Sequence, residues 1–119
     1  MADSSNHDLA AAHSHRIAGE YDAAHELYQK LVQGDESLGD AWWGLGLTLM
    51  NMGEFDESIA CLEKASSIDP QNQRYLLDLG KHQTMLGMFD EAKPVFERVV
   101  ALDDSTREAE DARNQLRYY

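Results

Sequence analysis

The sequence repeats itself with a period of 34 residues, and this period constrains the fold more than any other feature. One set of residues recurs when the chain is shifted forward by that length: Leu45, Gly46, Gly53, Phe55, Asp56, Glu57, Glu63 and Asp69 return as Leu79, Gly80, Gly87, Phe89, Asp90, Glu91, Glu97 and Asp103. Shifted backward, the matching positions hold Gly19, Tyr21, Asp22, Ala24 and Asp35. A fixed period of this length indicates an array of similar structural units.

Each copy contains two apolar stripes at helical spacing with a glycine between them. In the central copy the stripes consist of Trp42, Leu45 and Leu49, then Ile59, Leu62 and Ala65. Gly53 separates the two stripes, and Pro70 ends the second. The pattern predicts two short helices joined by a glycine turn. Across the chain it predicts helices over about 6–18, 55–68, 72–86, 89–102 and 105–117, with two further helices ending near Gly34 and Asn51.

Local signals predict where these helices begin and end. Three pairs of residues have capping-box spacing, namely Ser5 with Asp8, Ser37 with Asp40, and Ser105 with Glu108. Asp22 is expected to cap the second helix, and Gly34 to close it as a C-terminal glycine. Pro94 falls near the start of the sixth helix, where it is tolerated if that helix starts late, with a kink as the alternative. Tyr118 and Tyr119 are expected either to fray or to contact a neighbouring molecule.

The order W-x2-L-G-x2-L, G-x-F-D, S-x3-L and P in the central copy resembles the tetratricopeptide repeat (TPR) family. The resemblance covers repeats of about 5–38, 39–72 and 73–106, and the segment of about 105–117 is expected to cap them. It implies an all-α, right-handed α-solenoid of three helix-turn-helix units plus that capping helix, as a single domain over residues 1–119. Four residues depart from the family pattern: Asp8, His15, Gln83 and Asp104.

Composition limits the classes of partner. Ten Lys and Arg residues against 22 Asp and Glu residues give a formal net charge of −12, which repels nucleic acid and anionic membrane surfaces. The single Cys61 excludes an intramolecular disulfide framework. No segment has the length and apolar content of an export signal or a membrane span, so we expect a cytoplasmic protein.

The third helix carries a second apolar stripe of Trp43, Leu47 and Met50, beyond the stripe needed for its own hairpin. A helix that is apolar all round must be covered all round, either by a neighbouring helix, by the chain's own tail or by a partner. The TPR resemblance places this stripe on the concave face of the array. It implies a peptide-binding groove lined by Leu9, His13, Arg16, Ile17, Trp43, Leu47, Met50, Arg74, Leu77, Lys81 and Met85.

We therefore expect a non-enzymatic adaptor or chaperone-like module that binds an apolar peptide or amphipathic helix, with basic flanks on that ligand because the protein is acidic. The family's clamp for C-terminal carboxylates maps onto Leu9, His13, Gly44, Arg74 and Asp78, of which only Arg74 suits a carboxylate. The groove character is closer to that of three-repeat TPR chaperones that hold apolar segments of secreted proteins. The alternative is a structural scaffold that forms homo-oligomers through the same apolar surface.

A second alternative is a metal-binding or catalytic protein that uses the N-terminal histidines. His7, His13 and His15 do not have the i and i+4 spacing of a helical metal pair, so we expect no metal site and no cofactor. Cys61 is expected to be a buried, inert thiol rather than a nucleophile. The acidic pairs that open the second helices are expected to complement the helix dipole rather than to catalyse.

Overall fold

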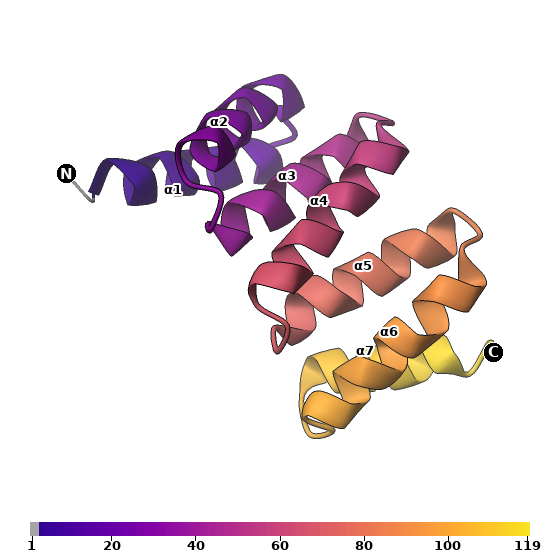
Figure 1. Ribbon diagram of the computed structural model, residues 1–119. Coiled ribbons are helices and arrows are strands. Elements are labelled where there is room, and N and C mark those ends of the chain that lie inside the picture. The colour runs from indigo at the N-terminus through magenta and orange to yellow at the C-terminus, as the bar shows by residue number, and fades with distance from the viewer. Residues whose placement is uncertain (1–2) are drawn as a thin grey trace. The chain divides into compact units, whose positions relative to one another are not determined.

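The computed structural model describes residues 3–119, and this part of the chain is all helical (Figure 1). Its helices are α1 (Asp3–Ile17), α2 (Tyr21–Gly34), α3 (Gly39–Asn51), α4 (Phe55–Ile68), α5 (Gln73–Met85), α6 (Phe89–Leu102) and α7 (Arg107–Leu116). The predicted all-α class is confirmed. The predicted bounds of the fourth and sixth helices coincide with those of α4 and α6.

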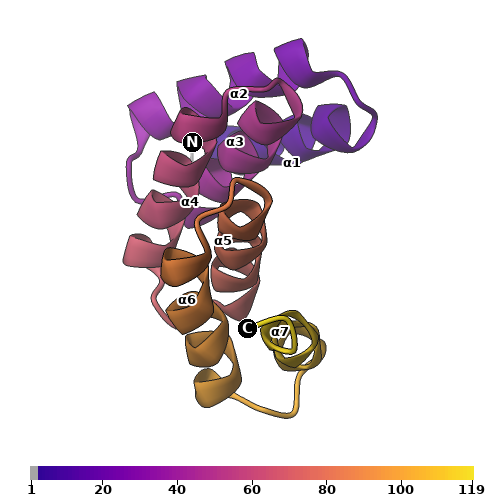
Figure 2. The same ribbon diagram turned by 90° about the vertical axis from the view of Figure 1, so that its right-hand side faces the viewer.

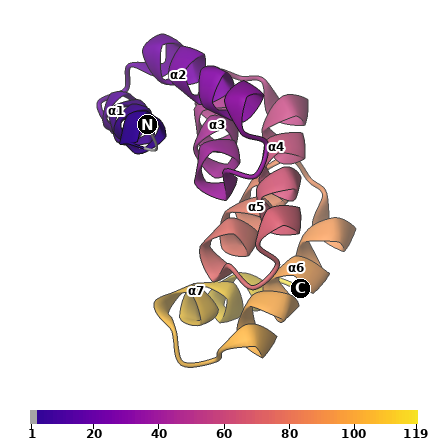
Figure 3. The same ribbon diagram turned by 60° about the vertical axis from the view of Figure 1, so that its left-hand side comes forward.

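The chain divides into two compact units, a first unit of residues 1–68 and a second unit of residues 69–119. In the first unit α1 packs on α2, α2 on α3 and α3 on α4, so two helical hairpins lie side by side (Figures 1 and 3). In the second unit α5 and α6 form a third hairpin, and α7 packs against both of its helices (Figure 2). Each unit therefore buries its own core.

A glycine with positive φ turns the chain within each hairpin. Gly19, Gly53 and Gly87 have φ values of 81°, 82° and 77°, in the left-handed region that favours glycine. Each turn also contains the same hydrogen bond across six residues, from the amides of Glu20, Glu54 and Met88 to the carbonyls of His15, Leu49 and Gln83 at 2.8, 2.9 and 2.8 Å. These bonds satisfy carbonyls at the end of each first helix. The 34-residue period of the sequence is thus matched by the same turn conformation in each hairpin.

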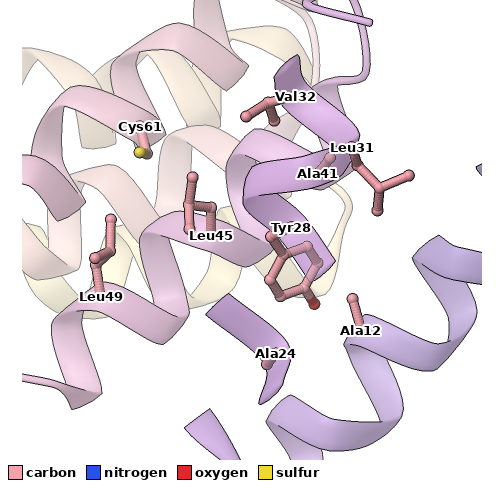
Figure 4. Close-up of a cluster of buried hydrophobic side chains, with 9 residues drawn as sticks. All are labelled: Ala12, Ala24, Tyr28, Leu31, Val32, Ala41, Leu45, Leu49 and Cys61. Atoms are coloured by element: carbon pink, nitrogen blue, oxygen red, sulfur yellow. The ribbon is translucent and has the colours of Figure 1, made fainter. Parts of the chain in front are cut away.

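The core of the first unit centres on Tyr28, whose side chain is fully buried (Figure 4). Its ring lies against α3 where Gly44 provides no side chain, and a Cβ built on Gly44 would lie 2.3 Å from Cζ of Tyr28. The absence of a Cβ therefore lets α2 and α3 approach closely. The other buried members of the cluster are Ala12, Ala24, Leu31, Val32, Ala41, Leu45, Leu49 and Cys61.

Helix α7 caps the second unit. Ala109 and Ala112 are fully buried against the α5–α6 hairpin. Glu110 and Arg113, which stand 34 residues after Leu76 and Leu79 of α5, are exposed. Helix α7 therefore keeps the apolar residues that pack on the preceding helices. At the positions where a following helix would pack it has polar residues, as a cap of a repeat array requires.

The predicted capping boxes are wrong. Helix α1 begins before Ser5, which lies within it. Ser37 and Ser105 instead donate their hydroxyl protons to Oδ1 of Asp35 and Asp103, each at 2.6 Å, so these hydroxyls serve the turns that precede α3 and α7. Thr106 caps α7, because its Oγ1 accepts the amide proton of Ala109 at 3.0 Å.

Two other predictions about helix ends are wrong. Asp22 lies within the first turn of α2 rather than at its cap, which is Glu20. Gly34 is the last residue of α2 and does not have a positive φ, so it is not a left-handed C-terminal glycine. Helix α6 begins at Phe89 as predicted, so Pro94 lies inside it and the late start that would make it harmless does not occur. The carbonyl that loses its intrahelical donor belongs to Asp90, which is exposed and can bond to water.

The contact between Tyr28 and Gly44 gives the first testable prediction. Gly44→Ala forces the new Cβ into the Tyr28 ring, and overpacking of this kind costs about 1–3 kcal/mol of unfolding free energy. Gly34→Ala is the matched control, because a Cβ there meets nothing within 4 Å. Chemical denaturation should show Gly44→Ala destabilised and Gly34→Ala unchanged or slightly stabilised. Equal stability of the two variants would contradict the close approach of α2 to α3.

Candidate functional site

Trp43 of α3 is half-buried, so its indole is neither sealed in the core nor fully open. In the first unit two side chains of α1 contact it. The guanidinium carbon of Arg16 lies 5.0 Å from the centroid of the indole, within the range of a cation–π interaction. The ring of His13 meets the indole edge-on, with centroids 5.9 Å apart at 68°. The second apolar stripe of α3 is therefore only partly covered by α1.

The hydroxyl of Tyr28 holds both α1 side chains in place. It accepts a hydrogen bond from Nε of Arg16 at 3.0 Å, and it is also hydrogen-bonded to Nδ1 of His13. A buried tyrosine hydroxyl needs such partners, and these two supply them from adjacent turns of α1. The Tyr28 side chain lies in the core with its hydroxyl directed towards α1 (Figure 4), and through that hydroxyl it orients the two residues that contact Trp43.

The hydrogen-bond roles in this cluster suit a neutral His13. Arginine can only donate, so the Tyr28 hydroxyl keeps its own proton to donate, and Nδ1 of His13 is a partner for it in the neutral tautomer protonated at Nε2, which is assigned from these roles. Burial, followed by the positive charge of Arg16, lowers the pKa of His13, and Asp40 opposes the shift. Burial raises the pKa of Tyr28, so its hydroxyl stays protonated. The hydrogen-bond geometry and the two pKa shifts therefore both favour a neutral His13 beside a protonated Tyr28.

The other predicted residues of the first unit differ in exposure. Leu9 and Leu47 are half-buried, and Ile17, at the end of α1, is 77% exposed. Met50 is buried and offers little surface. We define the α1–α3 surface as the six residues that remain accessible to solvent: Leu9, His13, Arg16, Ile17, Trp43 and Leu47.

The predicted residues of the second unit lie along α5. Leu77 is only 8% exposed and belongs to the core cluster with Phe96 and Ala112. Nζ of Lys81 lies 3.3 Å from Oδ2 of Asp111 and so links α5 to α7. Arg74 and Met85 are exposed, Met85 at 69%. Of the apolar residues predicted on α5, Met85 therefore offers surface to a partner and Leu77 does not.

Two of the residues weighed for metal binding or catalysis have structural surroundings that account for them. Nδ1 of His15 lies 2.8 Å from Oε1 of Glu20. Cys61 is buried, and its burial together with the charge of Glu57 raises the thiol pKa to about 11, which disfavours the nucleophilic thiolate. The remaining histidines form no metal site either, because among the described residues no three His, Cys, Asp or Glu side chains gather as metal ligands would. Within residues 3–119 no helix combines the length and apolar content needed to cross a bilayer.

Tyr28 is the site residue that the sequence pattern did not single out, because its position in the repeat is that of a core residue. The available signal was its chemistry, since a fully buried tyrosine must place its hydroxyl against a polar partner. His13 and Arg16, one turn apart on the preceding helix, were candidates for that role.

Comparisons with known proteins point to one family. A family model described as "Tetratricopeptide repeat" matches residues 15–76 and 49–116. Anaphase-promoting complex subunit 3 of Schizosaccharomyces pombe is 22% identical over 94 residues, which cover 79% of this chain and 14% of that protein. The chain thus spans about a seventh of the length of that relative.

Two solved structures share the fold. The type III secretion chaperone SycD of Yersinia enterocolitica, in complex with a peptide of the translocator YopD, has a TM-score of 0.85 at 20% identity, covering 98% of this chain and 88% of that chain. The first TPR of Spaghetti (RPAP3), bound to the HSP90 peptide SRMEEVD, has a TM-score of 0.85 at 20% identity, covering 96% and 88%.

The His13 cluster predicts a pH dependence of stability. The pKa of His13 is lower in the folded state than in the unfolded state, where it has the ordinary histidine value of about 6.5. Below about pH 6.5 the folded protein therefore binds fewer protons than the unfolded protein. The stabilisation is complete above that value and is lost as the pH falls through it. Between about pH 7.5 and about pH 5.5 the wild type should lose more unfolding free energy than His13→Gln, whose amide oxygen can still accept from Tyr28.

The pKa of His82 is also lowered, mainly by burial, but His82 is present in both proteins and cancels in their difference. Denaturant titrations at several pH values measure the effect. Parallel pH profiles for the two proteins would contradict a neutral His13 in this cluster.

Proposed function

This chain belongs to the tetratricopeptide repeat family, and from that membership and the α1–α3 surface we propose that it is a non-enzymatic protein-interaction module. Its α1–α3 surface, centred on Trp43, holds an apolar peptide or the apolar face of an amphipathic helix from another protein. The single observation that carries the proposal is the half-buried indole of Trp43, held between Arg16 and His13 with part of its surface accessible to solvent.

Trp43 suits the role of an anchor contact. Tryptophan is enriched among the residues that dominate binding energy, and Ile17 and Leu47 supply further apolar area on the same surface. The Tyr28 hydroxyl fixes both neighbours of the indole before any partner arrives. Side chains that are already ordered lose less entropy on binding, so this arrangement favours affinity.

The second unit supplies an additional candidate contact. Met85 stands at the position in its repeat that Ile17 occupies in the first, and both side chains are largely exposed. A flexible methionine adapts to partners of varied shape. We propose Met85 as a contact of the second unit, with the half-buried Lys81 one turn before it and the exposed Arg74 at the opposite end of α5. Leu77 is left out because it serves the core.

The nature of the ligand follows from charge and shape. SycD and the Spaghetti TPR were each solved with a bound peptide, which supports a peptide ligand for this chain. A carboxylate clamp is disfavoured because Gly44 has no side chain and is buried under Tyr28, and because Asp78 repels a carboxylate. With a net charge of −12, the protein should prefer apolar ligands with basic flanks.

The proposal is tested by selecting peptides from a displayed random library and measuring their affinities by fluorescence anisotropy. Trp43→Ala should weaken a selected peptide by about 30-fold, as truncation of a dominant tryptophan contact implies. Phe55→Ala is the matched control, because Phe55 is an exposed aromatic residue outside the α1–α3 surface, and it should change the affinity by less than about twofold.

Equal affinity of the wild type and Trp43→Ala would remove the proposed surface. Light scattering distinguishes the scaffold alternative, because a dimer that Trp43→Glu converts to a monomer would show that the same surface binds a second copy instead.

A further inference from the structure

A separate cavity lies within the second unit, where the end of α5, the start of α6 and the end of α7 meet. It has a volume of about 370 Å³ and is lined by Thr84, Phe89, Gln115, Tyr118 and Tyr119. We call it the aromatic pocket. None of its residues belongs to the α1–α3 surface, so the two sites share no side chain.

The walls of the aromatic pocket are ordered by contacts within the second unit. The rings of Phe89 and Tyr119 meet edge to face, with centroids 6.3 Å apart at 70°. The hydroxyls of Tyr119 and Thr84 lie 3.1 Å apart, and the Tyr119 ring also packs against the buried Phe96 at 6.4 Å. Tyr119 therefore contacts three side chains of its own unit. Tyr118 beside it is 89% exposed.

The electrostatics of the pocket favour a cation. Aromatic faces carry negative charge density, and three such side chains line this cavity. Asp90 and Glu91 directly follow Phe89 in the first turn of α6, and both are exposed. The Thr84 hydroxyl donates to the carbonyl of Gly80 at 2.9 Å and is bonded to the Tyr119 hydroxyl, so the Tyr119 oxygen keeps its lone pairs for an incoming donor, and the Gln115 amide oxygen is a further acceptor.

The two tryptophans of the first unit already have internal cations, but the aromatic pocket does not. Arg16 lies over Trp43 at 5.0 Å and Lys64 over Trp42 at 6.0 Å. Over residues 5–119, no cationic side chain is placed on Phe89, Tyr118 or Tyr119. The chain contains only ten Lys and Arg residues against 22 acidic ones, so a cation for this pocket comes most readily from another molecule.

We propose that the aromatic pocket binds an arginine side chain of a basic partner segment. The aliphatic stem of arginine suits the apolar walls, and its planar guanidinium stacks on aromatic faces while donating to the surrounding oxygens. The exposed carboxylates of Asp90 and Glu91 attract the charge from outside. The chemistry thus selects a ligand that is both apolar along its length and positive at its end.

The test uses three blocked tripeptides that differ at the central residue, acetyl-Gly-X-Gly-amide with X as arginine, citrulline or norleucine. Citrulline preserves the shape of arginine without its charge, and norleucine preserves only the stem. Titration into the full chain, followed by amide NMR shifts, should show saturable changes at Thr84, Phe89, Gln115, Tyr118 and Tyr119 with the arginine peptide. The other two peptides should bind at least about threefold more weakly.

The chain provides a matched control for nonspecific attraction. Phe55, Asp56 and Glu57 repeat the sequence of Phe89, Asp90 and Glu91. Phe89 lines the aromatic pocket together with two tyrosines, whereas Phe55 does not line it. Phe89→Ala should weaken the arginine peptide by about two- to fivefold, the effect of one exposed cation–π contact, whereas Phe55→Ala should not. Tyr118→Ala, which removes a highly exposed ring, should repeat the loss without disturbing the fold.

Three results would overturn the proposal. Equal shifts with citrulline or norleucine would show a merely apolar pocket. Equal shifts around Phe55 would show attraction to acidic residues anywhere on the chain. Unchanged binding by Tyr118→Ala and Phe89→Ala would show that the rings take no part. Trp43→Ala should leave the arginine titration unchanged, so failure of the α1–α3 surface and failure of the aromatic pocket are distinguishable.

Discussion

The approach of Tyr28 to Gly44 is the contact on which the first unit depends. Because Gly44 has no side chain, the Tyr28 ring fits between α2 and α3, and its hydroxyl reaches α1. There it orients His13 and Arg16, which in turn contact Trp43. One buried ring therefore joins three helices and connects the core of the unit to its candidate binding surface.

The three helical hairpins are built around the same glycine turn. A glycine in the left-handed region turns each hairpin, and the same carbonyl position accepts the same hydrogen bond each time. Helix α7 ends the pattern by keeping its buried alanines and placing charged residues where the next helix would pack. Stability then comes from neighbouring elements, as in other repeat proteins, and Trp43 and Leu47 of α3 keep part of their surface accessible to solvent.

The fold was predictable from the sequence because its signals are periodic. Spacing at 34 residues identified the helices, the glycine turns and the cap without any knowledge of contacts. The site was less predictable. The 34-residue period assigns Leu77 to the same face as Trp43, and helical spacing assigns Met50 to it, but burial depends on neighbours in space, and both residues are covered. Similarly, Ser37 and Ser105 have the spacing of helix caps, yet nearby aspartates compete for their hydroxyls. The role of the Tyr28 hydroxyl depends on contacts across 12 and 15 residues, which no local pattern specifies.

The central claim is that the Tyr28 hydroxyl sets the environment of Trp43, and Tyr28→Phe tests it most directly because the ring and its packing remain. The measurement is the NMR shift of the two indole N–H groups in the wild type and in the variant. The Trp42 indole donates to the carbonyl of Glu36 at 2.9 Å and serves as the internal reference. We predict that the Trp43 signal moves when Arg16 and His13 lose their anchor while the Trp42 signal stays in place. A Trp43 signal that is unchanged in a folded Tyr28→Phe protein would contradict this account.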